Sequence, residues 1–328
     1  MSVALCFWIL LLQNADLATG KDPDYPSKPI TYYISFGPGG TADLANRAFI
    51  EAAAKHLGKP FIPINRAGAG GSLAATAVLN AKPDGYTLGG TPAGIAFTLP
   101  FTEPAPYKDL SGFTFVANFG KLVYPLMVRA DAPWETWNEL IEWAKKNPKG
   151  IKVGITGARE VTVQGYTLLK IEKLENVKFT YMPLKSSAEA LSATLGGHIT
   201  LYGSTVDAST MPYLKERKVR ILAFMGLKDE KIPGYENIPS TEELYGVSIP
   251  KALGVMGPKG LSENVLNRLD DGFAKAIEDP DFNKVMDRMC IPVVYMNRAK
   301  MNKHMDELYR QGAEFIKMLK AEETKGKN

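Results

Sequence analysis

The hydrophobic pattern of this chain repeats a strand, a glycine-rich loop and a helix. Residues 30–36 form an apolar run rich in β-branched and aromatic side chains, which stops at Gly37–Gly40. A helical pattern follows over 42–57 and ends at a glycine. A second strand over 61–65 is followed by another glycine-rich loop and helix over 66–81. Two successive units of this kind predict a parallel α/β sheet, with both loops at the carboxyl ends of its strands.

The rest of the chain continues the same alternation. A third strand precedes a long extended apolar stretch, and a fresh α/β pattern begins near Gly150. The strands that we expect are 86–90, 151–155, 177–183, 199–202, 219–225, 253–258 and 292–295. The helices that we expect after residue 130 are 136–146 behind a capping box, 161–174, 187–195, 210–216, one capped by Ser262, 281–289 and 299–319.

The first glycine loop has the features of an anion-binding site. We expect Thr41 to cap the helix that follows and Asp43 to lie in its first turn, where a negative charge suits the helix dipole. Glycines let the backbone approach a ligand closely, and a helix N-terminus offers unpaired N–H groups. The sequence therefore predicts an anion cradle at residues 37–43 without naming the anion.

Composition and charge exclude several classes of function. The chain has 328 residues, long enough for two domains, and its net charge of +4 is spread along the whole length. No block of Lys or Arg indicates nucleic-acid binding. The three histidines match no zinc spacing and are interpreted as ordinary surface or helix-end residues, and the three tryptophans at 134–143 as core packing. We expect no enzyme, no metal and no cofactor.

A nucleotide-binding interpretation stays open as a minor alternative. The loop does not fit the G-x-G-x-x-G pattern cleanly, and no Gly-Lys-Ser/Thr sequence provides a P-loop. Asn65 and Arg66 end the second strand where a dinucleotide fold has an acidic residue, although an arginine there suits a 2′-phosphate.

The N-terminus predicts an export signal over residues 1–20. A ten-residue apolar run, 3–12, is too short to span a bilayer but suits a signal-peptide core. Ala18 and Gly20 supply small residues for a cleavage site just before Lys21. Because no basic residue precedes the run, the alternative is a buried N-terminal helix. Cleavage would leave Cys290 as the single cysteine, so no internal disulfide is expected.

Three sequence blocks, in order, resemble the Bug-type substrate-binding proteins of tripartite tricarboxylate transporters. They are Pro26-x-Lys-Pro-Ile30 followed by Phe36-x-Pro-Gly-Gly-x-x-Asp43 and Arg47, then Asn65-Arg-x-Gly-Ala-Gly-Gly71, then Lys82-Pro-Asp-Gly-Tyr-Thr-Leu88. Weaker matches extend to about residue 320, including Gly254-Val-Met-Gly-Pro258.

The resemblance implies an α/β, two-domain, type II periplasmic-binding-protein fold, a Venus flytrap whose domains are mostly parallel sheets flanked by helices. It places domain 1 at 26–124 plus 250–328 and domain 2 at 125–249, with the ligand between them. The implied protein is a monomeric periplasmic receptor of a Gram-negative bacterium, which passes a small organic carboxylate to membrane permease subunits. Two alternatives are a ligand-sensing Bug protein that feeds a signalling system and a cytoplasmic nucleotide-dependent oxidoreductase.

The resemblance also supplies candidate ligand contacts in both domains. These are Phe36, Gly37, Pro38, Gly39, Gly40, Thr41, Ala42, Asp43, Gly70, Thr91, Thr156, Gly157, Ala158, Arg159 and Ser204. The segment 156–164 departs from the family's Ser-Gly-x-Gly-Ser-x-x-His-Leu pattern and carries a charged pair, Arg159 and Glu160. That pair is either a solvated surface ion pair or a grip for a second anionic group, since the planar guanidinium suits a carboxylate.

Overall fold

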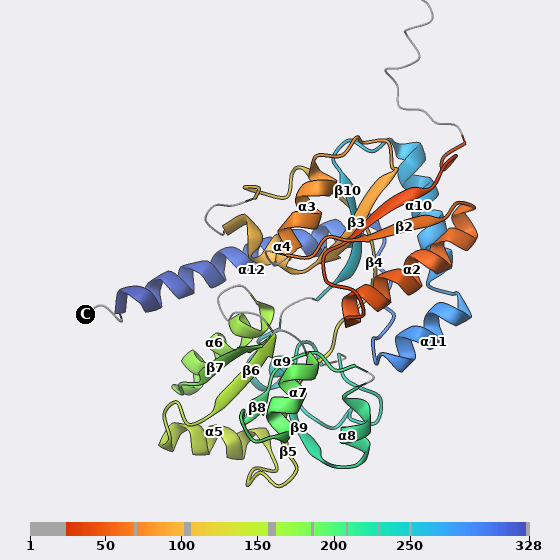
Figure 1. The fold of residues 1–328 in the computed structure, drawn as a ribbon. Helices are drawn as coiled ribbons and strands as arrows, with labels where there is room; N and C mark the ends of the chain where they lie inside the picture. The colour runs from red at the N-terminus through yellow and green to blue at the C-terminus, as the bar shows by residue number, and fades with distance from the viewer. Residues whose placement is uncertain are drawn as a thin grey trace, which may run out of the picture.

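The computed structural model describes residues 24–68, 71–101, 106–156, 162–184, 187–207, 209–228, 230–248 and 251–325. Within these ranges the strands form two five-stranded sheets, with helices packed against both. Figure 1 shows the two sheets in separate halves of the molecule, one above the other. The predicted α/β class is confirmed. The predicted signal peptide lies outside the described residues.

The first sheet is built from the N-terminal strands and one late return strand. Its order is β2 (Phe61–Asn65), β1 (Ile30–Ile34), β3 (Thr87–Pro92), β10 (Leu253–Pro258) and β4 (Phe113–Gly120). The pairs of β1 with β2 and with β3 are parallel, as the strand–loop–helix pattern predicts. The return strand β10 is antiparallel to both of its neighbours, so the sheet is mixed rather than mostly parallel.

The second sheet has the same mixture of directions. Its order is β7 (Thr180–Leu184), β6 (Lys152–Thr156), β8 (Leu201–Tyr202), β5 (Tyr124–Arg129) and β9 (Val219–Met225). The pairs around β6 are parallel, and the pairs around β5 are antiparallel. In both sheets the antiparallel pairs involve a strand that adjoins a chain crossing, β5 or β10. Such a strand enters its sheet from the other half of the molecule, without the helical crossover that makes neighbours parallel.

The helices cover both faces of each sheet (Figure 1). In the upper half they are α2 (Thr41–Leu57), α3 (Ser72–Leu79), α4 (Gly94–Phe97), the 3₁₀ turn η3 (Leu99–Phe101), α10 (Glu263–Ala276), α11 (Pro280–Arg288) and α12 (Arg298–Lys325). In the lower half they are α5 (Trp137–Lys146), α6 (Val163–Glu175), α7 (Ser187–Leu195), α8 (Met211–Lys215) and α9 (Thr241–Tyr245).

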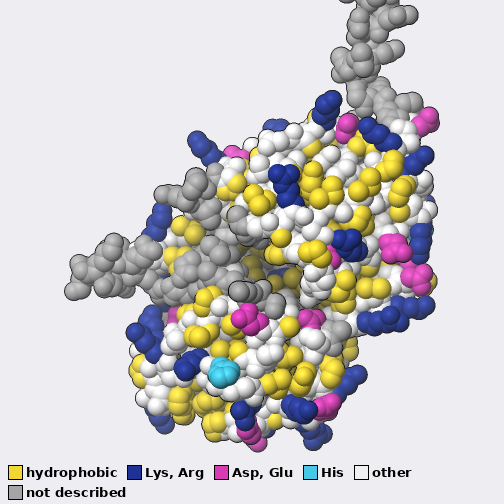
Figure 2. Space-filling model, in the orientation of Figure 1, with side chains coloured by type: hydrophobic (Ala, Val, Ile, Leu, Met, Phe, Trp, Pro, Cys, Tyr) yellow, Lys and Arg dark blue, Asp and Glu magenta, His cyan; other side chains and the backbone are white. Residues whose placement is uncertain are grey.

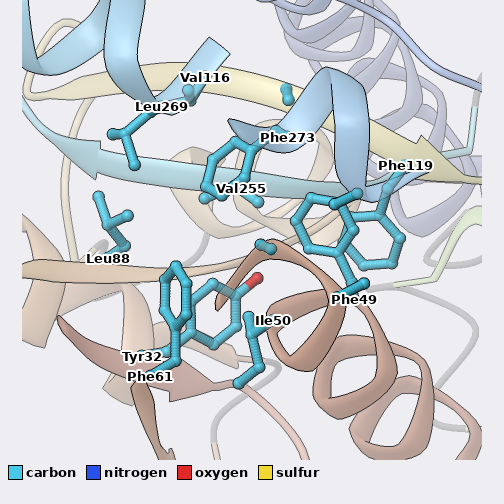
Figure 3. Packing of buried hydrophobic residues seen from close by; sticks show 14 of the residues in the cluster. Tyr32, Phe49, Ile50, Phe61, Leu88, Val116, Phe119, Val255, Leu269 and Phe273 are labelled. Atoms are coloured by element: carbon cyan, nitrogen blue, oxygen red, sulfur yellow. The ribbon is translucent and has the colours of Figure 1, made fainter. Parts of the chain in front are cut away.

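The core beside the candidate loop is packed with aromatic side chains. Figure 3 shows Phe49 of α2 against Phe119 of β4, and their rings stack with centroids 4.2 Å apart. Phe273 of α10 lies on the other side of Phe49, at 5.1 Å between ring centroids. These contacts fix α2 against the sheet, so its N-terminus is held at the carboxyl end of β1.

Several local predictions are confirmed, and one predicted strand is absent. The capping box of Thr136 and Glu139 is present at the start of α5, and Trp134 packs edge-on against Trp143. The predicted strand 292–295 does not form; the next residue, Met296, makes an isolated bridge with Asn118. The short helices α4 and α9 were not predicted, since four or five residues are too few for a helical period.

Candidate functional site

The first glycine loop joins the end of β1 to the start of α2, as predicted. The N-cap, however, is Gly40 rather than Thr41, and no side chain caps this helix end. Gly40 has φ −78° and ψ 164°, the extended backbone of an N-cap. Because no side chain occupies the position, the N–H groups of the first turn, at Thr41 and Ala42, are left to an external acceptor.

Asp43 holds this loop in place through hydrogen bonds to its carboxylate. Its carboxylate accepts hydrogen bonds from the Gly39 N–H at 2.8 Å, from Arg47 Nε at 2.9 Å and from Asn65 Nδ2 at 2.7 Å. Arg47 Nη2 also donates to Asn65 Oδ1 at 2.6 Å. Asp43 is 2% exposed, so its carboxylate faces the protein and holds the loop in place.

A shallow hollow, open to solvent, lies beside this helix end. Its lining residues come from β1, α2, β3 and β10, and they are Ser35, Phe36, Ala42, Asn46, Gly90, Thr91, Pro92, Leu253 and Gly254. The Thr91 side chain is 2% exposed, and its Oγ1 is buried with no hydrogen-bond partner among the described residues. A buried hydroxyl without a partner costs free energy, so this oxygen marks where a polar ligand group fits.

The second glycine loop approaches the same hollow. Gly71 has φ +99°, and a Cβ added there would lie 3.3 Å from Pro92 Cγ and 3.3 Å from Ser35 Cβ. Gly71 is therefore required both by its backbone conformation and by close packing. The neighbouring Gly70, a predicted contact, lies outside the described residues.

The structure brings some of the predicted residues together and leaves others apart. Phe36, Ala42 and Thr91 line the hollow. The exposed Gly37–Gly40 and the half-buried Thr41 connect Phe36 to Ala42 but are not among the lining residues. Ser204 is completely buried and lines neither this hollow nor the one described next. Thr156 is the last residue of β6. Gly157, Ala158 and Arg159 lie outside the described residues.

Sequence reasoning missed several lining residues of this hollow. Asn46 lies one turn after Ala42 on α2, so helical spacing alone could have found it. Its amide donates to the Ala42 carbonyl at 2.7 Å and accepts from Tyr32 Oη at 2.7 Å. Leu253 and Gly254 belong to the return strand, and no local signal in the sequence points to the hollow.

A second shallow hollow, open to solvent, lies where the chain passes between the two sheets. It is lined by Tyr124, Val163, Gln164, Thr167, Met225 and Lys251. Thr162 caps α6 above it by accepting from the Gly165 N–H at 3.1 Å. The space-filling view shows the surface hollowed between the two halves of the molecule (Figure 2).

Two lysines converge on one glutamate beside the second hollow, and we call Lys121, Glu230 and Lys251 the hinge cluster. Lys121 lies on the outgoing crossing between β4 and β5, and Lys251 on the return towards β10. Glu230 lies 3.2 Å from the Lys121 amine and 3.1 Å from the Lys251 amine. Burial would raise the pKa of Glu230, but the two lysines hold it below its ordinary value.

His304 of α12 is not the ordinary surface histidine that the sequence suggested. Its Nε2 is buried and has no hydrogen-bond partner among the described residues. Burial, with Lys121 nearby, lowers the pKa of His304 to about 4. The ring is therefore neutral near pH 7 and adds no charge to the hinge cluster.

No group of three or more metal-ligating side chains occurs among the described residues. In the same part of the chain, no helix is long and apolar enough to cross a membrane. The first hollow offers hydrogen-bond donors, from backbone N–H groups and a hydroxyl, which are the kind of groups that suit an anion.

Comparisons with known proteins agree with this geometry. The family model of the tripartite tricarboxylate transporter family receptor, TctC, matches residues 45–320. The "UPF0065 protein in gbd 5'region" of Cupriavidus necator is 28% identical over 92% of this chain and 90% of its own length.

Solved structures share the fold. A TctC solute-binding protein from Polaromonas is 27% identical, with a TM-score of 0.74 over 90% of this chain and 99% of that one. MatC from Rhodopseudomonas palustris with bound malate is 24% identical, with a TM-score of 0.72 over 90% and 99% of the two chains. The family resemblance read from the sequence is confirmed, and the chain belongs to the receptor family of the tripartite tricarboxylate transporters, the Bug-type solute-binding proteins.

Proposed function

We propose that this protein is a periplasmic receptor that captures a small organic carboxylate and delivers it to the permease subunits of a tripartite tricarboxylate-type transporter. Proteins of this family are periplasmic binding proteins. The signal peptide at 1–20 and cleavage before Lys21 belong to this proposal, as does a cleft between the units 26–124 plus 250–328 and 125–249.

The observation that carries the proposal is the Thr91 hydroxyl beside the open end of α2, which has no hydrogen-bond partner in the described parts of the chain. Thr91 Oγ1 is buried in the hollow, and the first-turn N–H groups of α2 border the same space. Gly39 donates its own N–H to Asp43, so that donor is already used. A ligand carboxylate would accept from the remaining N–H groups and from the hydroxyl.

Gly40→Val tests this arrangement. The extended backbone at Gly40 suits a β-branched residue, and an added Cβ would meet only Gly37 O, at 3.7 Å. The variant should therefore fold, while its side chain blocks the N–H groups that face the hollow. We expect calorimetry to show at least a tenfold loss of affinity for the best ligand of a carboxylate panel, with Gly40→Ala intermediate.

The panel contains mono-, di- and aromatic carboxylates and is first screened by thermal shift. A ligand at a hundredfold its dissociation constant adds roughly 2.7 kcal/mol to the free energy of unfolding, which such a screen resolves easily. Unchanged affinity in the folded Gly40→Val variant would place the ligand elsewhere.

A further inference from the structure

The first sheet exposes apolar side chains on one face of its edge strand β2. Phe61 of β2 packs against Phe273 in the core, with ring centroids 6.5 Å apart, so the alternate residues Ile62 and Ile64 point to the opposite face. Helix α3 packs on that face against β1, β3 and β10. At the edge strand, Ile62 and Ile64 remain 49% and 40% exposed.

Two neighbouring side chains extend this apolar surface. Tyr33 of β1 is the register partner of Ile64 and is half-buried. Leu73, in the first turn of α3, is 45% exposed and lies against the loop that follows β2, since a Cβ added to Gly68 would be 2.9 Å from its Cδ1. We call Tyr33, Ile62, Ile64 and Leu73 the β2 face. Figure 2 shows hydrophobic side chains gathered on this side of the upper half, over β2 and α3. Exposed apolar patches of this kind mark interaction sites.

The charge around the β2 face is positive. Residues 25–42 and 52–83, which include β1, β2 and α3, contain five Lys or Arg residues and no Asp or Glu. Arg66, exposed at the end of β2, lies 5.8 Å from the centroid of the Tyr33 ring. Neither Arg66 nor Lys59, at the start of β2, forms an ion pair with another described residue. An apolar surface with such cations is complementary to a segment that combines apolar side chains with Asp or Glu.

The free edge of β2 does not favour a partner that adds a strand to the sheet. Pro63 lies in the middle of β2 and has no N–H group to donate to a further strand. A partner is therefore held by the side chains of the β2 face, and its own side chains decide whether it fits.

We propose that the β2 face docks an acidic, apolar segment on the periplasmic side of the permease. The inference rests on the proposed function, in which the receptor delivers its ligand to that permease. The end of β2 is also tied to the candidate ligand loop, because Asn65 Nδ2 donates to the Phe36 carbonyl at 2.8 Å and to Asp43 at 2.7 Å. A partner on this face therefore contacts the strand that helps to hold the loop.

Photocrosslinking of the full-length protein, in cells of the bacterium that makes it, tests the contact. Ile64 is replaced by p-benzoylphenylalanine, the cells are irradiated, and the products are identified by mass spectrometry. We expect a crosslink between this position and a permease subunit. The matched control is the same replacement at Leu174, which is 59% exposed on α6 in the other half and should give no such product.

Reversing the charge of Arg66 tests the acidic character of the partner. Arg66→Glu should lower the yield of the permease crosslink from position 64 at least fivefold, whereas Arg66→Lys should keep it within twofold. The shifts in melting temperature that succinate, adipate and benzoate produce should be the same in Arg66→Glu as in the wild type, because Arg66 does not line the first hollow. That comparison separates a loss of docking from a loss of ligand binding.

Several outcomes would overturn the inference. A crosslink from position 64 to a second copy of the chain alone would make the β2 face an interface between copies. The absence of a permease product, an equal product from positions 64 and 174, or an unchanged yield in Arg66→Glu would each reject the docking surface. If carboxylates still shift the melting temperature in that case, the receptor function stands without this surface. If the permease crosslink forms but no carboxylate shifts the melting temperature, carboxylate capture fails and the docking surface stands.

Discussion

Asp43→Asn is the sharpest test of how the first glycine loop is held. The substitution keeps the size of the side chain but replaces one carboxylate oxygen by an amide NH₂ group. One oxygen of Asp43 serves Arg47 and Asn65, and the other serves the Gly39 N–H. If the asparagine oxygen keeps the first two partners, its NH₂ group faces the Gly39 N–H, and two donors meet across 2.8 Å.

The structure gives the size of the effect. A lost hydrogen bond to a charged group costs about 1.5–3 kcal/mol. The pair with Arg47 adds little, because the Arg47 side chain is 38% exposed and solvent screens it. We therefore expect a loss of about 2–3 kcal/mol in the free energy of unfolding. For domains of this size each kcal/mol lowers the melting temperature by about 2–4 °C.

Binding should weaken as well, because the ligand must then order a loop that Asp43 no longer tethers. Fixing one backbone residue costs roughly 1–2 kcal/mol, which corresponds to about a 5- to 30-fold loss of affinity. Thermal melting followed by circular dichroism and calorimetry with the best carboxylate measure the two effects. The matched control is Asp131→Asn, since Asp131 pairs with Arg129 at the surface and is 65% exposed. The reasoning is refuted if the two variants melt alike and bind alike.

Two further predictions concern pH and processing. Because burial lowers the pKa of His304 to about 4, the unfolded chain binds more protons than the folded one between pH 4 and 6.5, so stability falls as the pH drops through that window. The wild type should lose up to about 3 kcal/mol more than His304→Gln between pH 7 and pH 4 in denaturant titrations, and parallel pH profiles would contradict the assignment. The mature chain from the cell envelope should begin near Lys21, which mass spectrometry checks directly; an intact Met1 on cytoplasmic protein would contradict export.

The part of the first hollow that could be predicted is the part formed by residues that are close together in the sequence. A strand, a glycine loop and a helix follow one another within residues 30–57, so both the position of the loop and its exposure of N–H groups could be read locally. The direction in which the Asp43 side chain points could not be predicted in this way. Asp43 lies three residues after the N-cap, and whether it faces solvent or the protein depends on Arg47 and Asn65, which the fold brings together.

The contribution of the return strand lay beyond local sequence reasoning. β10 pairs with β3 and β4, which precede it in sequence by more than 130 residues, and its antiparallel direction follows from its entry out of the second half of the molecule. Leu253 and Lys251 therefore reach the two hollows through topology. Lys251, in particular, has no neighbouring motif that marks it, because its partner Glu230 lies in another segment.

The two hollows differ in the kind of charge that they offer. In the first, Arg47 is already paired with Asp43, so the donors on offer are the neutral groups of Thr91 and of the start of α2. Neutral donors hold an anion less strongly than a direct ion pair does. In the second, the amines of Lys121 and Lys251 share the single carboxylate of Glu230, where the chain crosses between the two sheets.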